Sequence, residues 1–143
     1  MRRHTLTLGL CMLALAGLAR AGDLAPGLWE LGLEARTDAD PTFLPGAITA
    51  NQCLTKADAA DPSKVLAPLA TAGATGCTYT EKSYVGQKFR FSMQCSGTLD
   101  LKTTGEVTFS ATTLRGTITT TSSLDGKPLE LKSTLVGRRL GDC

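Results

Sequence analysis

Polar and apolar residues alternate along much of this chain. The run from Lys88 to Cys95 alternates without a fault, and the runs from Trp29 to Arg36 and from Glu106 to Ala111 show the same pattern. A strand that alternates in this way places one face on a core and the other in water, which is how antiparallel sheets behave. The pattern therefore predicts a mainly β protein.

Glycine-containing pairs separate these runs at short intervals and mark hairpin turns. They are Val85-Gly86, Ser96-Gly97, Thr104-Gly105 and Asp125-Gly126. Such short connections join neighbouring strands, so we expect an antiparallel meander sheet that curls toward a half-barrel or a small barrel. Its strands are expected over residues 28–36, 46–52, 78–84, 88–95, 105–111, 114–123 and 128–138.

One short helical segment interrupts the strand pattern. Asp61-Pro62 is a typical helix start, because proline suits the first helical position and aspartate suits the cap. Three apolar residues then fall on one face, which predicts a helix over residues 62–70 that covers part of the sheet. Just before it, residues 55–58 have the composition to cap a first turn.

Large aromatic side chains supply much of the core of a small domain. Trp29, the one tryptophan, is expected to anchor the core from the first strand, and the lining of a ligand groove is its alternative role. The other expected core anchors are Phe89, Phe91 and Phe109.

The N-terminus carries the three parts of a secretory signal peptide. A basic start precedes an apolar run over Leu6–Leu18 and the small-x-small site Ala19-Arg20-Ala21. Cleavage is expected between Ala21 and Gly22. It would remove 21 of the 143 residues and leave 122 as a single disulfide-linked β-rich domain over residues 22–143.

Loss of the signal peptide changes the charge of the chain. Three of the 15 basic residues lie in that segment, which leaves 12 basic against 13 acidic residues. Without a basic excess, nucleic-acid binding is not expected. The apolar run of the signal is shorter than the roughly 20 residues of a membrane helix, so no membrane span is expected after cleavage.

Candidate catalytic residues are few, because the one histidine, His4, lies in the signal peptide. A mature chain without imidazole excludes a Ser-His-Asp triad, a Cys-His pair and a histidine-ligated metal, and no cofactor is expected. A Ser-Lys pair stays open, although no serine is singled out, and the main enzymatic alternative is a small hydrolase with two converging carboxylates such as Glu30, Glu34 or Glu106. Two aspartate pairs are interpreted as turn and cap residues rather than a calcium or acid site: Asp38 with Asp40, and Asp58 with Asp61.

Four cysteines remain after cleavage, and none of them forms a C-x-x-C pair. Because exported proteins meet an oxidising compartment, two disulfides are expected rather than a metal site. Cys77 and Cys95 lie nine residues on either side of Gly86. A hairpin centred on that glycine sets the two cysteines opposite each other and places Ser83 opposite Phe89.

The second expected disulfide joins Cys53 to Cys143. Both residues reach the same end of the sheet if the strands over 46–52 and 78–84 run in the same direction. The alternative is a sequential pairing, Cys53 with Cys77 and Cys95 with Cys143, which requires the helix merely to loop back beside Cys53.

Several short motifs carry a resemblance to a known family. They are Pro26–Glu30, Gln52–Thr55, Gly76–Thr78, Met93–Cys95 and Gly137–Cys143. The chain resembles the bacterial domain-of-unknown-function family 3617, small exported proteins of proteobacteria, over essentially the whole mature domain. The resemblance implies a periplasmic location and assigns no catalytic or binding residue.

Together these features favour a monomeric, non-enzymatic periplasmic module that binds an unknown envelope protein or a small ligand. One specific version is an inhibitor or accessory of an envelope hydrolase, by analogy with other small disulfide-linked β domains. The alternative from another class is the carboxylate-dependent hydrolase.

Overall fold

The structure, a computed structural model, describes residues 24–37, 47–71, 74–97, 100–124 and 126–143. Its strands are β1 (Gly27–Arg36), β2 (Ile48–Leu54), β3 (Cys77–Val85), β4 (Lys88–Ser96), β5 (Asp100–Phe109), β6 (Thr113–Leu124) and β7 (Lys127–Gly141). Its helices are α1 (Lys56–Ala60) and α2 (Pro62–Thr71). Among these residues one antiparallel sheet contains every strand, which confirms the predicted fold class.

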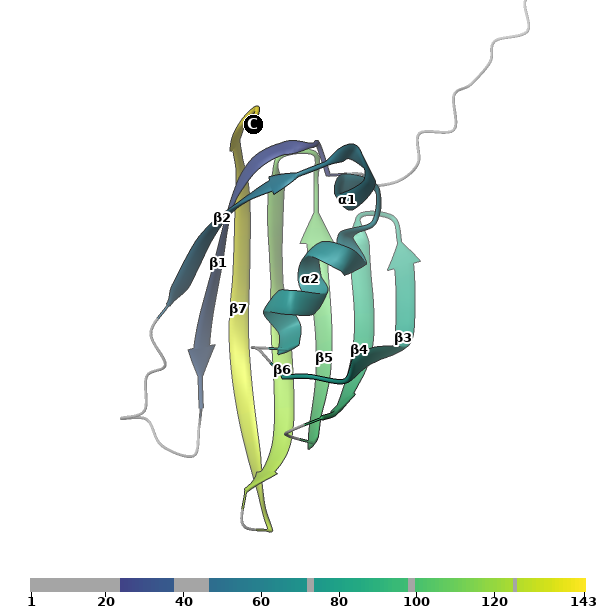
Figure 1. The fold of residues 1–143 in the computed structure, drawn as a ribbon, viewed down its shortest axis with the longest axis vertical. Coiled ribbons are helices and arrows are strands. Elements are labelled where there is room, and N and C mark those ends of the chain that lie inside the picture. The colour runs from purple at the N-terminus through teal and green to yellow at the C-terminus, as the bar shows by residue number, and fades with distance from the viewer. Residues whose placement is uncertain (1–23, 38–46, 72–73, 98–99, 125) are drawn as a thin grey trace, which may run out of the picture.

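The strand order in the sheet is β2-β1-β7-β6-β5-β4-β3. The strands from β3 to β7 form the expected meander. The last strand, β7, also pairs with the first strand, β1. The sheet curls without closing into a barrel, so β2 and β3 remain as its two edges (Figure 1). All neighbours are antiparallel, and β2 and β3 therefore run in the same direction from opposite edges.

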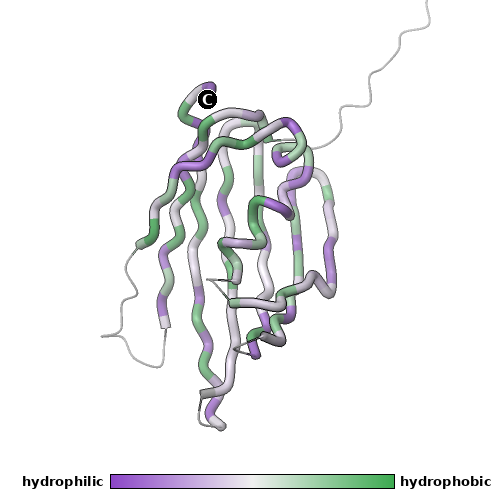
Figure 2. Tube along the Cα trace, viewed as in Figure 1, coloured by the Kyte–Doolittle hydropathy of each residue, from purple (hydrophilic) through white to green (hydrophobic). Residues whose placement is uncertain are grey.

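The core lies between the concave face of the sheet and α2, which crosses that face (Figure 1). Hydrophobic and hydrophilic positions interleave along the strands, as the alternation requires (Figure 2). Val65 and Leu66 of α2 are buried against the sheet. The four aromatic residues expected in the core are all buried there: Trp29, Phe89, Phe91 and Phe109.

One predicted turn is wrong. Thr104-Gly105 was expected between strands, but Gly105 lies in the middle of β5, directly opposite Phe91 of β4. A Cβ atom built on Gly105 would come within 2.4 Å of the Phe91 ring. The glycine therefore makes room for an aromatic ring on the sheet, which is the other common use of glycine inside a strand.

The loop of the β3–β4 hairpin is one residue shorter than the expected loop over residues 85–87. The loop is Gly86-Gln87, and Tyr84 rather than Ser83 lies opposite Phe89. Gly86 has a φ of 59°, which suits a tight two-residue turn. The register then shifts by one residue at a β-bulge around Thr80. This shift restores the expected pairing at the far end of the hairpin.

The structure has two helices where one was expected. The segment before α2 forms the separate short helix α1, with Thr55 as its N-cap. The Thr55 hydroxyl accepts from the Asp58 backbone N–H, and the Asp58 carboxylate accepts from the Thr55 backbone N–H, so the two residues form a capping box. Within the described ranges, no helix has the length and hydropathy of a membrane span.

Candidate functional site

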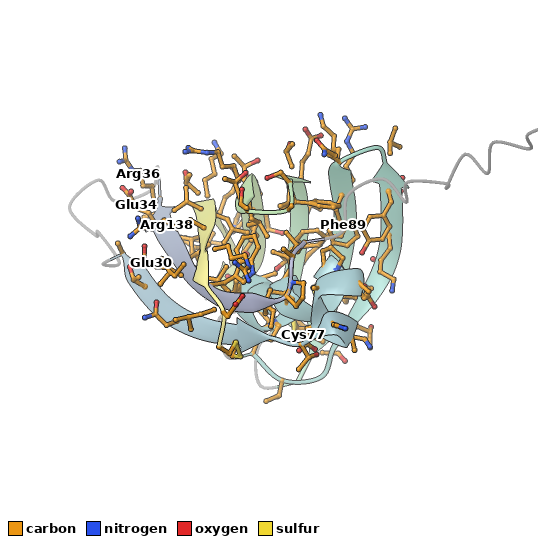
Figure 3. The ribbon with its side chains drawn as sticks, turned by 90° about the horizontal axis from the view of Figure 1, so that it is seen from above. Glu30, Glu34, Arg36, Cys77, Phe89 and Arg138 are labelled. Carbon is orange, nitrogen blue, oxygen red and sulfur yellow. A yellow bond between two sulfur atoms is a disulfide. The ribbon has the colours of Figure 1, made fainter. Side chains whose placement is uncertain are left out.

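A groove of about 330 Å³ crosses the outer face of the sheet over β2, β1, β7 and β6. It is lined by Glu30, Gly32, Thr49, Thr113, Arg115, Val136, Gly137 and Arg138. Side chains alternate between the two faces of a strand. Residues an even number of positions from Leu31 face the core with it, and the residues between them face outward, where the groove lies. Figure 3 shows Glu30 and Arg138 on the outer side of the curl and Phe89 inside it.

Gly32 forms the floor of the groove, because it has no side chain to fill that space. Gly32 of β1 lies between Thr49 of β2 and Val136 of β7 in the sheet register. A Cβ atom at Gly32 would lie 3.2 Å from a methyl group of Val136. Val136 itself is 43% exposed. The groove thus offers a small apolar surface between polar walls.

One wall of the groove carries an ion pair. Nε of Arg138 lies 2.7 Å from a carboxylate oxygen of Glu30 across the β1–β7 pair. The hydrogen bond to that carboxylate raises the pKa of Arg138 above its ordinary value. The positive charge of the Arg138 guanidinium is therefore already balanced by the Glu30 carboxylate.

The other wall carries Arg115, whose guanidinium has no such neighbour. Four other arginines in the described ranges each have a carboxylate partner: Arg36 with Glu34, Arg90 with Glu106, Arg138 with Glu30 and Arg139 with Asp142. Arg115 is the one arginine among the described residues without a carboxylate within salt-bridge distance. It is exposed and also lines a second hollow on the same face, beside Val136.

The three carboxylates proposed for a hydrolase do not converge. Glu30 and Glu34 lie on the same face of β1, four residues or roughly 13 Å apart along the strand. Glu106 lies on β5, three strands away, which is roughly 14 Å. Hydrogen bonds from Lys88 and then Arg90 hold the pKa of Glu106 below its usual value, the opposite of what a general acid needs.

Two of the four aspartates singled out in the sequence are helix-capping residues. Hydrogen bonds from Thr55 lower the pKa of Asp58 at the start of α1. Partial burial works to raise the pKa of Asp61, but the hydrogen bonds from Ser63 and the charge of Lys82 outweigh it, and the net shift is downward. Asp38 and Asp40 lie outside the described residues. No group of three metal-ligating side chains occurs in the part of the chain that the structure describes.

Sequence reasoning missed a tyrosine cluster that joins α2 to β3. The hydroxyl of Tyr79 donates to the Ser63 carbonyl oxygen at 2.6 Å, and that of Tyr84 donates to the Asp61 carboxylate at 3.3 Å. The Lys82 ammonium lies 5.3 Å from the centre of the Tyr79 ring. Burial, as the largest cause, raises the pKa of both phenols. The cluster fastens this edge of the sheet to the helix.

Two disulfides hold the two edges of the sheet. Cys53 at the end of β2 is joined to Cys143, and Cys77 at the start of β3 is joined to Cys95 of β4. These are the pairs expected from the strand directions. The expected cleavage site, Ala21-Gly22, lies outside the described residues.

The groove was also not foreseen from the sequence, although one signal for it exists. Gly32 occupies an outward position in an otherwise regular alternating strand, where no turn demands a glycine. Such a glycine indicates a close approach or a hollow. Nothing in the sequence singled out Arg115, because the lack of a partner depends on strands that lie next to each other only in the folded sheet.

Comparison with known proteins gives one result. Residues 24–143 match the family described as protein of unknown function (DUF3617). No curated protein and no solved structure matches significantly. The match covers all five described ranges, including both edges of the sheet and the outer groove. The chain therefore belongs to the DUF3617 family of proteins of unknown function.

Proposed function

We propose that this protein is a non-catalytic binding module of the periplasm, and that the groove over Gly32 is its binding site. The observation that carries the proposal is the unpaired guanidinium of Arg115 beside a hollow with an apolar floor. An exposed cation with no internal partner is available to an anionic group of a ligand or of a partner protein.

The chemistry of the groove supports a ligand with mixed character. Val136 presents methyl groups, and Thr49 and Thr113 present hydroxyls that donate and accept hydrogen bonds. A few polar groups placed around an apolar surface are typical of sites that bind small molecules or peptide side chains. The proposed ligand carries a carboxylate or a similar anion next to a short apolar group.

The state of the carboxylates favours binding over catalysis. Glu30 and Glu106 each hold an arginine, and the pKa of Glu106 is lowered. A carboxylate hydrolase needs one acid kept protonated near neutral pH beside a second carboxylate. The positions of Glu30 and Glu106 support neither a protonated acid nor a second carboxylate beside it.

The periplasmic location is supported by the covalent framework. Disulfides persist in oxidising compartments, and the two in this structure hold both sheet edges. If export proceeds as proposed, intact mass of the protein recovered from the periplasm will match a chain that begins at Gly22. A mature form that retains Met1, or one lipidated at Cys11, would contradict the proposed cleavage.

Affinity capture from periplasmic extract, followed by mass spectrometry of bound proteins and lipids, tests the binding role. The comparison uses the wild type, Arg115→Ala and Gly32→Ala, each checked for folding by circular dichroism. The matched control is Lys102→Ala, which removes an exposed cation of the same face outside the groove. We expect a partner that the wild type and the control retain and that both groove variants lose. A partner retained by Arg115→Ala would refute the groove as the binding site.

A further inference from the structure

The edge strand β2 is regular, neutral and exposed. It pairs with β1 through all of its seven residues without a register shift. Every residue from Ile48 to Cys53 is exposed, and Ile48 is 62% exposed. The strand contains no charged residue and no proline. Among the residues that the structure describes, no strand lies beside its outer side.

The other edge strand, β3, has the features that block pairing with a further strand. A β-bulge interrupts it at Thr80, and the next two residues are the exposed charges Glu81 and Lys82. Bulges and charges of this kind are common protections of sheet edges in natural proteins. Because β2 has neither, its outward N–H and C=O groups remain available to an extended chain.

We propose that β2 pairs antiparallel with β2 of a second copy of this chain, about a two-fold axis at Asn51. The pairing sets Ile48 opposite the second copy's Leu54, and Asn51 opposite its own counterpart. Each pair in this register joins two even-numbered or two odd-numbered residues. The outward-facing residues of one copy therefore lie on the same face of the joined sheet as the outward-facing residues of the other copy. The sheet continues from one copy into the next.

The second copy is the favoured occupant because β2 is complementary to itself. A neutral strand that pairs with itself brings no like charges together, whereas two β3 strands would pair charged and bulged segments. A two-fold axis also gives a closed dimer rather than an open fibre. One added strand pair buries less than the roughly 800 Å² per partner of a standard interface, so the dimer is expected to be weak.

This pairing is independent of the proposed binding function and has one consequence for it. Thr49 of β2 is part of both the edge and the groove. A two-fold axis perpendicular to the sheet places the grooves of both copies on the same outer face. Arg115 lies on β6, three strands from β2, so the two Arg115 side chains of the dimer are seven strand spacings or roughly 34 Å apart, and a small ligand would meet only one of them.

Sedimentation velocity of the mature, disulfide-linked chain over a concentration series tests the pairing. We expect a monomer at low concentration and a growing dimer fraction at high concentration. Asn51→Lys and Asn51→Asp each place like charges opposite each other at the axis, and each is expected to weaken dimerisation about two- to fivefold. An equimolar mixture of the two variants is expected to recover a mixed dimer.

Thr78→Lys is the matched control, since it adds a charge to the opposite edge at an exposed position of β3. It is expected to leave dimerisation unchanged, and circular dichroism confirms that each variant is folded. A wild type that stays monomeric at every concentration overturns the proposal. So does an Asn51→Lys variant that dimerises as well as the wild type, or a Thr78→Lys variant that loses the dimer.

Discussion

The two edges of the sheet differ in how they are protected, although each is held by a disulfide. At β3 the chain adds a bulge, two charged residues and a tyrosine cluster that fastens the strand to α2. At β2 the disulfide to Cys143 is joined by a short contact with α1, and the strand is otherwise exposed. One edge is therefore fastened to the helical segment by side-chain contacts, and the other has no comparable contact along most of its length.

This difference shows that anchoring and shielding of an edge are separate properties. The Cys53–Cys143 disulfide fixes the position of β2 but leaves the outward backbone groups of the strand accessible. The tyrosine cluster and the bulge at β3 both hold the strand and discourage a neighbour. An edge that is held firmly and remains accessible is the kind of surface that recognises another strand.

Removal of the disulfides is expected to have the largest effect. Cys53→Ser with Cys143→Ser opens a loop of 90 residues, and the loop-entropy account predicts a loss of about 4–5 kcal/mol in the free energy of unfolding. Cys77→Ala with Cys95→Ala opens a loop of 18 residues and is expected to cost about 3 kcal/mol. Urea denaturation measures both.

Peptide mapping without reduction provides the control for that comparison. It is expected to recover Cys53 linked to Cys143, and Cys77 linked to Cys95. A peptide that links Cys53 to Cys77 would contradict the strand directions. Equal losses of stability in the two double variants would show that loop length does not govern the difference between the edges.

Alkaline pH is expected to destabilise the β3 edge selectively. The chain has two tyrosines, Tyr79 and Tyr84, and burial raises the pKa of both in the folded state. The folded protein therefore retains its phenolic protons more tightly than the unfolded chain does. The resulting stability is fully present below about pH 10 and is lost as the pH rises through the folded-state pKa values.

Urea midpoints at pH 8 and pH 11, together with tyrosinate absorbance, measure this effect. The double variant Tyr79→Phe with Tyr84→Phe is the control and is expected to lose less stability between the two pH values than the wild type. Phenols that titrate in the folded protein near their ordinary pKa would contradict the prediction.

Tyr79→Phe is expected to lower the free energy of unfolding by about 1 kcal/mol at neutral pH. It removes the hydroxyl that donates to the Ser63 carbonyl oxygen and keeps the ring contacts with Phe89 and Phe91. Tyr84→Phe is the matched control and is expected to cost less, because its hydrogen bond is longer and exposed. A free energy of unfolding that Tyr79→Phe leaves unchanged would show that the link to α2 does not depend on this hydrogen bond.

Conversion of β3 into an edge like β2 is expected to change stability least and association most. Deletion of Thr80 makes the pairing with β4 continuous and keeps Cys77 opposite Cys95. Glu81→Thr and Lys82→Thr then remove the charges, at about 0.5–1 kcal/mol for the lost contact of Lys82 with Tyr79. Sedimentation should show new association, and the Thr80 deletion alone, which keeps the charges, should show less.

The sequence by itself determined which segments form strands and which cysteines lie at the same end of the sheet. Alternation is a local pattern, because each strand must place one face on the core, and strand directions follow from short turns. The interpretation of Thr104-Gly105 as a turn was wrong because a glycine in a strand and a glycine in a turn look alike locally. Only the position of the Phe91 ring distinguishes them.

Only the tertiary structure decided which strands are the edges and where the outer groove lies. The order of the sheet depends on the pairing of β1 with β7, whose residues are roughly a hundred positions apart in the chain. The lack of a carboxylate partner for Arg115 depends on the register of β6 with β5 and β7, which places Thr108 and Val136 opposite it. Local patterns specify the faces of each strand, whereas edges, registers and surface pairs arise from contacts between distant segments.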